Sequence, residues 1–279
     1  MSISVFDPTP CQLGEGPLWH PSLGCLFWFD ILGKRLFQRT DKTRHWNFDE
    51  IVTAAGWIDD DRLLIASETR LFTFSLSTEA KETVCLLESD NPDTRSNDGR
   101  ADPFGGFWIG TMGKSGQKDA GAFYRFYKGE LRQLFAPIST TNAICFSPDG
   151  TFAYFADTPT HIIQRVALDS EGWPDGDPEP WLDLSEEALR PDGAVTDAAG
   201  NLWNAQWGAA RIACYSPDAK LLETIAIPAN LATCPAFGGA DLTTLFCTSA
   251  SVKDDGPAAG QTFAIETAHK GTPEPAVII

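Results

Sequence analysis

The chain has 279 residues, with 21 lysines and arginines against 38 aspartates and glutamates, so its formal net charge is −17. This charge excludes nucleic acid and anionic membrane surfaces as expected partners, because both would meet a repulsive field. An anionic small molecule would need local cations to bind.

No secretory or membrane-spanning segment is predicted. The first residues lack a basic stretch followed by a long apolar run, and no run approaches the ~20 apolar residues that a membrane span needs. The seven cysteines are scattered, form no C-x-x-C pair, and several lie in apolar runs. We expect them to be small buried residues in a reducing cytoplasm, with no disulfides and no cysteine zinc site.

A short pattern recurs along the chain: a turn with Pro, Asp or Gly, then an apolar strand rich in aromatic residues. Its copies lie at 21–30, 59–66, 102–110, 147–154, 197–203 and 238–246. One turn residue marks each copy, namely Gly24, Asp61, Gly105, Gly150, Gly200 and Asp241. The intervals between these markers are 37, 44, 45, 50 and 41 residues.

Intervals of this length match one four-stranded propeller blade each, since such blades run about 40–50 residues. We therefore predict an all-β fold, with residues 1–279 forming one six-bladed β-propeller domain around a central channel. We also expect the segment around 3–6 to complete the last blade and close the ring.

The sequence lacks the motifs that mark several enzyme classes. It contains no G-x-S-x-G, no G-x-G-x-x-G opening a helix, no G-x-x-x-x-G-K-[ST] and no H-E-x-x-H. None of the four histidines is paired at metal-ligand spacing. A serine triad and a histidine zinc site are therefore not expected.

Three polar residues share one position in successive repeats. Asn97, Asn142 and Asp192 each lie eight residues before the marker of their blade. Equal offsets imply equal radial positions, so these side chains are predicted to point into one channel. With Glu15, which two glycines flank, they would form an all-oxygen cage that suits Ca²⁺, Mg²⁺ or Mn²⁺. The alternative is that these residues only begin turns before strands.

Five segments in the same order resemble the gluconolactonase/regucalcin (senescence marker protein) family. They are LGEGP at 13–17, SNDGRAD at 96–102, FWIGTM at 107–112, RPDG at 190–193 and FGGADLTTL at 237–245. The resemblance covers about residues 12–250 and implies a six-bladed propeller that hydrolyses sugar lactones with one divalent metal. It leaves the metal open among Ca²⁺, Zn²⁺, Mn²⁺, Mg²⁺ and Fe²⁺.

Carried over by position, the resemblance implies metal ligation by Glu15, Asn142 and Asp192. It implies substrate contacts by Arg95 and Asn97. The interpretation is metal-assisted hydrolysis, in which the metal polarises the lactone carbonyl and water attacks it. Asp192 is the expected catalytic general base, while Arg95 and Asn97 orient the ring.

The expected activity is that of a carboxylic ester hydrolase in sugar-acid catabolism. The substrate would be a pentono- or hexonolactone, such as xylono-, arabinono- or gluconolactone, and the product the aldonic acid. Alternatives are an aldarolactone lactonase, an esterase or phosphotriesterase on the same scaffold, and a non-catalytic calcium-binding propeller. The protein is expected to act as a monomer or small homo-oligomer.

The segment after Met112 departs from some relatives, which carry an acidic loop there. Here it contains Lys114 and Lys118. Either this segment is a solvated hairpin, or one of the two lysines binds a carboxylate of the substrate.

Overall fold

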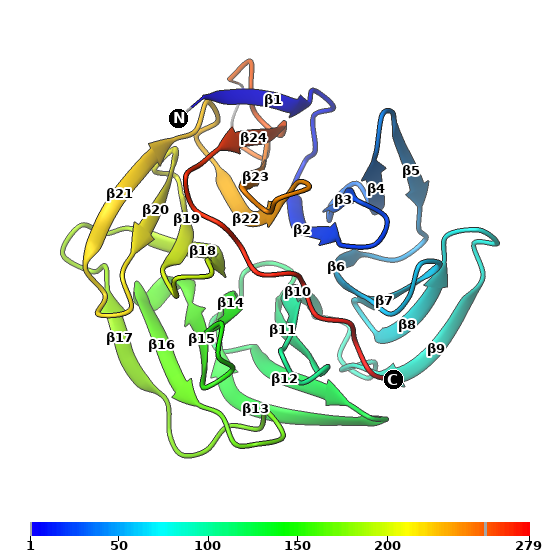
Figure 1. Cartoon of the computed structure of the whole chain (residues 1–279). Coiled ribbons are helices and arrows are strands. Elements are labelled where there is room, and N and C mark those ends of the chain that lie inside the picture. Colours follow the sequence, from blue (N-terminus) through cyan, green and yellow to red (C-terminus); the bar gives the residue numbers. More distant parts are fainter. Residues whose placement is uncertain (1, 254–255) are drawn as a thin grey trace.

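Six four-stranded antiparallel sheets are arranged in a ring in the computed structural model, which describes residues 2–253 and 256–279 (Figure 1). The six-bladed β-propeller predicted from the repeat is confirmed. The strand of each marked repeat becomes the second strand of its blade, and the first strand of each blade lies innermost, against the inner strands of its neighbours.

The first three blades are β2 (Gly14–His20), β3 (Cys25–Asp30), β4 (Arg35–Arg39), β5 (Thr43–Asn47); β6 (Val52–Trp57), β7 (Arg62–Ser67), β8 (Arg70–Ser75), β9 (Lys81–Leu86); and β10 (Thr94–Ala101), β11 (Phe107–Gly113), β12 (Gly121–Tyr127), β13 (Glu130–Ile138). The next two are β14 (Thr141–Phe146), β15 (Phe152–Asp157), β16 (Ile162–Ala167), β17 (Glu179–Asp183); and β18 (Arg190–Thr196), β19 (Leu202–Trp207), β20 (Arg211–Tyr215), β21 (Leu221–Ala226). The sixth comprises β22 (Ala232–Gly238), β23 (Thr244–Ser249), β24 (Thr262–Glu266) and β1 (Ile3–Asp7). A 3₁₀ turn, η1 (Thr158–Thr160), follows β15.

The first and last strands of the chain meet in the sixth blade, whereas the segment after β24 continues across the ring towards the second and third blades (Figure 1). The N-terminal strand β1 pairs antiparallel with β24, with Ile3 opposite Ile265 and Val5 opposite Phe263. The expectation that the N-terminal strand completes this blade is confirmed. Pairing of the first strand with the last covers an edge that would otherwise be unpaired.

Aspartates stand in the turn before the apolar strand in five of the six repeats, and their hydrogen bonds explain this recurrence. One carboxylate oxygen of Asp102, and likewise of Asp197, accepts hydrogen bonds from the main-chain N–H groups two and four residues later. Such side-chain bonds replace main-chain pairing in the tight turn and fix the start of the next strand.

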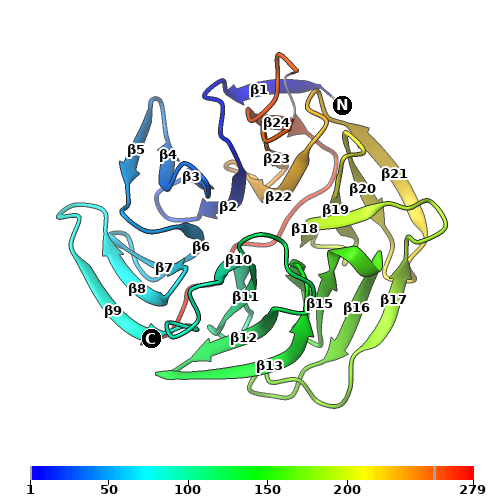
Figure 2. The ribbon, with the colours of Figure 1, turned by 180° about the vertical axis from the view of Figure 1, so that it is seen from behind.

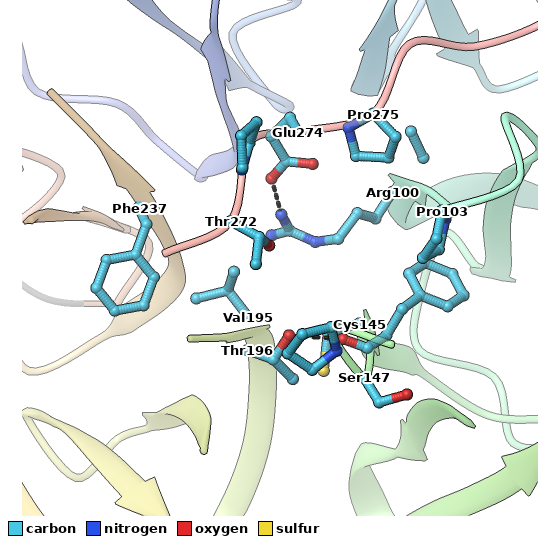
Figure 3. Close-up of a pocket in the computed structure, with 14 residues that line it drawn as sticks. Arg100, Pro103, Cys145, Ser147, Val195, Thr196, Phe237, Thr272, Glu274 and Pro275 are labelled. Carbon is cyan, nitrogen blue, oxygen red and sulfur yellow. Dashed lines mark hydrogen bonds and ion pairs between the residues drawn. The ribbon is translucent and has the colours of Figure 1, made fainter. Parts of the chain in front are cut away.

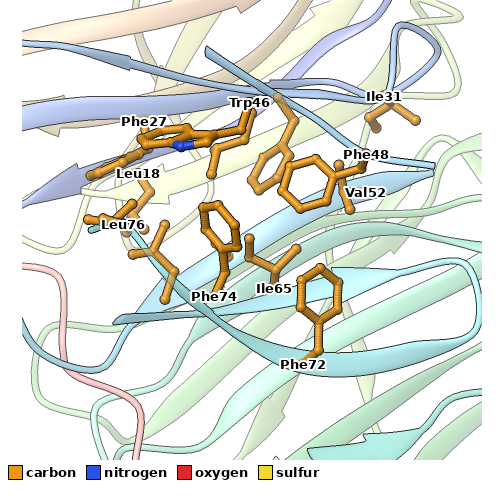
Figure 4. Packing of buried hydrophobic residues seen from close by; sticks show 14 of the residues in the cluster. Leu18, Phe27, Ile31, Trp46, Phe48, Val52, Ile65, Phe72, Phe74 and Leu76 are labelled. Atoms are coloured by element: carbon orange, nitrogen blue, oxygen red, sulfur yellow. The ribbon is translucent and has the colours of Figure 1, made fainter. Parts of the chain in front are cut away.

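The core lies between neighbouring blades. In Figure 4, Leu18, Phe27 and Trp46 of the first blade pack against Phe72 and Phe74 of the second. A similar cluster joins the third and fourth blades, and aromatic rings dominate both. Because each cluster draws on two sheets, burial of these rings holds the blades to one another as well as within themselves.

All seven cysteines are free, and six of them are buried, as predicted for small apolar residues. Within the described residues, no helix is long and apolar enough to cross a membrane.

A buried ion pair provides a test of how the third blade is held. Arg125 Nε lies 2.6 Å from Asp102 Oδ2, and both side chains are fully buried. Arg125→Leu would leave the carboxylate buried without its counter-charge, so we expect a loss of about 3–5 kcal/mol in the free energy of unfolding, measured with denaturant. The exposed pair of Arg62 and Asp59 is the control, because Arg62→Leu should cost at most about 1 kcal/mol. Equal losses of unfolding free energy in the two variants would contradict the conclusion that the buried pair stabilises the third blade more than an exposed pair does.

Candidate active site

All five predicted site residues line one cavity of about 460 Å³ at one mouth of the channel. The lining is Leu13, Glu15, Arg95, Asn97, Met112, Thr140, Asn142, Thr158, Pro159, His161, Arg190, Asp192 and Trp207. The inner strands β10, β14 and β18 contribute residues from their first halves. The shared offset of Asn97, Asn142 and Asp192 in the repeats therefore corresponds to a shared place in three dimensions.

Irregular pairing turns these side chains into the channel. The register between the first and second strands shifts directly after Glu15, Ser96, Asn142 and Pro191, at the same level in four blades. Such bulges re-aim side chains at the end of a sheet. After Glu15 the chain has φ 53° at Gly16, where a Cβ atom would lie 2.5 Å from the Thr53 carbonyl oxygen, so only glycine fits.

A row of buried hydrogen bonds connects β10 to β14. Arg95 Nη1 donates to Asn97 Oδ1 at 2.7 Å and to the Ser96 carbonyl at 2.8 Å. Asn97 Nδ2 donates in turn to the Thr141 carbonyl at 2.8 Å and to Asn142 Oδ1 at 3.2 Å. These bonds fix the guanidinium of Arg95 and the amide of Asn97 next to each other.

The row continues from β14 to β18. Asn142 Nδ2 donates to Thr158 Oγ1 at 2.8 Å, and the Thr158 hydroxyl donates to the Pro191 carbonyl at 2.7 Å. The amide nitrogen of Asn142 is therefore occupied, while its oxygen accepts only the longer bond from Asn97 and keeps a lone pair for a ligand.

Two carboxylates are buried here without a counter-ion. Glu15 is 7% exposed and Asp192 4%, and neither forms an ion pair within the described residues. Burial raises the pKa of both groups, and the charge of the nearby Asp98 raises it further. The only hydrogen bond that the Glu15 carboxylate accepts from the described residues comes from the Gly16 N–H, at 3.0 Å. A bound cation would offset this charge.

The donor chemistry fits a divalent metal. Two carboxylates and an amide oxygen are hard ligands, and water can complete the coordination. Across residues 2–253 and 256–279, no three His, Cys, Asp or Glu side chains form a metal-binding group. The predicted third protein ligand, the amide oxygen of Asn142, lies in the same cavity as the two carboxylates.

Buried Arg95 supplies positive charge beside this cage. Burial lowers its pKa to about 10, against the opposing influence of the Glu15 and Glu68 carboxylates. The guanidinium consequently stays protonated at neutral pH. The cavity thus combines an oxygen-rich cation site with a fixed donor for an oxygen of the substrate.

Sequence reasoning missed several groups. Asp98 is buried behind the cavity, where its Oδ2 accepts a hydrogen bond from the Ile144 N–H at 2.8 Å, and burial raises its pKa. His161, Arg190 and Trp207 line the mouth. The RPDG motif contains Arg190, but no sequence signal marked His161 or Trp207.

The two lysines after Met112 do not line the cavity. Lys114 Nζ lies 2.5 Å from a carboxylate oxygen of Glu68, and the side chain of Lys118 is 86% exposed. Neither lysine is therefore placed to bind a substrate carboxylate. Lys114 is already paired with Glu68, and Lys118 does not line the cavity.

A second cavity of about 250 Å³ lies at the other end of the inner strands. The C-terminal segment crosses the ring on that face only, as Figures 1 and 2 show from opposite sides. Figure 3 shows Glu274 of this segment paired with Arg100, whose guanidinium also donates to the main-chain carbonyls of Ile144 and Pro235. The charged groups there satisfy one another, so we assign this cavity a structural role.

The family follows from comparison with known proteins. Residues 13–251 match the family described as SMP-30/gluconolactonase/LRE-like region. The chain belongs to this family. It is 40% identical to a Rhizobium meliloti (strain 1021) protein whose name assigns it to the sugar lactone lactonases, over 95% of this chain and 93% of that protein.

Two further relatives agree. The L-arabinolactonase of Azospirillum brasilense is 34% identical, over 96% of this chain and 93% of the relative. The crystal structure of a calcium-binding protein, regucalcin, from Agrobacterium tumefaciens str. C58 superposes with a TM-score of 0.95 at 38% identity, covering 99% of this chain and 97% of that one. The family resemblance expected from the five motifs is confirmed.

Metal binding should stabilise the protein measurably. Saturating Ca²⁺ or Mn²⁺, added after chelation, is expected to raise Tm by about 5 °C, because a ligand at 100 times its Kd adds about 2.7 kcal/mol. Glu15→Gln should lose this shift, yet melt above the wild type when both lack metal, because it relieves the repulsion between buried carboxylates. Lys118→Gln, an exposed control, should keep the shift. A metal-induced shift that Glu15→Gln retains would contradict the assignment of this ligand.

Proposed function

We propose that this protein is a metal-dependent sugar lactonase that hydrolyses an aldonolactone to the aldonic acid. Pentono- and hexonolactones, such as xylono-, arabinono- and gluconolactone, are the proposed substrates. The observation that carries the proposal is the convergence of two unpaired buried carboxylates, an amide oxygen and a fixed arginine on one cavity. Its volume of about 460 Å³ suits a ligand of monosaccharide size. The names of the lactonase relatives support the same reaction.

Glu15, Asn142 and Asp192 would hold a divalent ion in this proposal. When bound, such an ion supplies a Lewis acid that polarises the lactone carbonyl and stabilises the developing oxyanion. Asp192 takes the proton from the attacking water and returns it to the ring oxygen as the carbon–oxygen bond breaks. Arg95 and Asn97, locked together by their hydrogen bond, orient the lactone for attack.

The activity can be tested with a panel of lactones and metals. We expect hydrolysis of pentono- or hexonolactones above the spontaneous rate, followed with a pH indicator. The rate should depend on one of Ca²⁺, Mg²⁺, Mn²⁺, Zn²⁺ or Fe²⁺ and vanish after chelation. Aldarolactones, aryl esters and phosphotriesters belong in the same panel, because they represent the alternative activities. Binding of calcium without turnover of any compound would favour the non-catalytic propeller.

Asp192→Asn tests the proposed base. The amide cannot accept the proton from water, so we expect kcat to fall about 10²–10⁴-fold while Tm in the metal-free state does not decrease. The matched control is Asp175→Asn, which changes the same Pro-Asp-Gly tripeptide in an exposed loop and should leave kcat intact. Wild-type kcat in Asp192→Asn would remove this residue from the mechanism.

A further inference from the structure

One arginine differs from all the others in its surroundings. The sequence contains twelve arginines, and eleven of them contact a carboxylate, an amide or carbonyl oxygen, or an aromatic ring. The side chain of Arg190 makes no such contact with any residue in 2–253 and 256–279. Arg44 and Arg95 also lack an ion pair, but each donates to a side-chain amide oxygen, so Arg190 is set apart by having no acceptor at all among the described residues.

The position of Arg190 places this free charge at the active-site mouth. Arg190 begins β18 and lines the same cavity as Asp192, two residues further along the strand. Two residues of a strand span about 7 Å. The pairing of β18 with β19 becomes irregular directly after Pro191, and both side chains line the cavity. Arg190 is exposed, whereas Asp192 is 4% exposed, so the arginine lies nearer to solvent and the carboxylate at the floor.

An apolar wall stands beside this cation. Trp207 of β19 pairs with Arg190 in the strand register, is half-buried and lines the cavity. Next to them, His161 Nδ1 donates to the Leu189 carbonyl at 2.7 Å, which fixes the imidazole on the same side. The mouth therefore offers one exposed cation beside an aromatic side chain, an arrangement that suits the charged end and the apolar face of a sugar acid.

The other cations near the cavity are already occupied. Arg95 is held by Ser96 and Asn97 at the floor, and Lys114 is paired with Glu68. An anionic ligand approaching this acidic protein would thus find its available counter-charge at Arg190. Binding there costs the protein no existing ion pair.

We propose that Arg190 binds a second, negatively charged group of the lactone, at the end of the molecule away from the carbonyl. Within the proposed lactonase function, this narrows the substrate class to a sugar lactone with a carboxylate or phosphate substituent, in place of the neutral pentono- and hexonolactones. The planar guanidinium can donate two parallel hydrogen bonds to either group. This inference rests on the proposed lactonase function and names the residue that selects among lactones.

Matched substrates and variants test the proposal. The substrates are gluconolactone, which is neutral, glucarolactone, which carries a carboxylate, and 6-phosphogluconolactone. For the wild type, kcat/KM should be higher for at least one anionic lactone than for the neutral one.

Arg190→Gln should lower the ratio of kcat/KM for that anionic lactone to kcat/KM for the neutral one about 10–100-fold, mainly through KM, because charge-assisted bonds are lost. Arg190→Lys should retain part of the preference, and Lys118→Gln, which removes an exposed charge outside the cavity, should change the ratio less than about 2-fold. The two anionic substrates distinguish carboxylate from phosphate.

An unaltered preference in Arg190→Gln, or a wild type that prefers the neutral lactone, would overturn the inference while leaving the lactonase proposal intact. If no lactone is hydrolysed, the proposed function fails, and calorimetry with the metal-loaded protein decides about Arg190. Tighter binding of glucarate than of gluconate, lost in Arg190→Gln, would still support an anion site. Equal binding of the two acids by the wild type would refute it.

Discussion

The main constraint on this structure is that several negatively charged groups are held out of water at one end of the propeller channel. Glu15, Asp98 and Asp192 are all buried there, and each raises the free energy of the others' charged forms. Hydrophobic collapse alone would not bring such groups together. The cluster persists because the rest of the ring is stable without it, through aromatic cores between neighbouring blades and pairing of the first strand with the last. Local instability at a functional site commonly coexists with a rigid scaffold in this way.

Three arginines along the same channel differ in their burial and in their partners. Arg100 is buried and paired with Glu274 of the C-terminal segment at the far end. Arg95 is buried at the cavity floor, where it is fixed by neutral oxygen acceptors and faces the charge of Glu15. Arg190 is exposed at the mouth. The charge at the far end is paired within the chain, whereas Glu15, Asp192 and Arg190 at the near end form no ion pair with the residues that the structure describes.

The repeat made much of this predictable. A period of about 40–50 residues specifies blades because each blade is one meander with an apolar second strand. Three polar residues at equal offsets, Asn97, Asn142 and Asp192, line the same cavity for that reason. Glu15 lies nine residues before its marker, and it was identified through the family motif. Relative to the bulge, Asn97 and Asp192 lie one residue further along their strands than Glu15 and Asn142, so a count from the turn marker gives the place of a residue only to within one position.

The same bulges set the limit of sequence reasoning. Asn97 and Asp98 are adjacent, yet the first lines the cavity and the second accepts a hydrogen bond from the Ile144 N–H behind it. Only the local backbone decides which of two neighbours faces the channel. Lys114 had appeared available for a ligand, but its partner Glu68 lies 46 residues earlier in the sequence. The sequence lists charges without showing which of them neutralise one another.

Residues that take part in the proposed reaction and a residue that selects the substrate differ in whether their polar groups are already bonded within the protein. Groups at the floor must be held by hydrogen bonds before substrate arrives, because the reacting atoms tolerate little misplacement. The row from Arg95 through Asn142 to Thr158 meets that requirement. A residue that selects the far end of the substrate has the opposite requirement, since it must exchange water for ligand. An exposed arginine beside a tryptophan, with no acceptor among the residues that the structure describes, loses only solvent when it binds an anion. On this physical ground, we assign the proposed hydrolysis to the floor of the cavity and the proposed selection among lactones to its mouth.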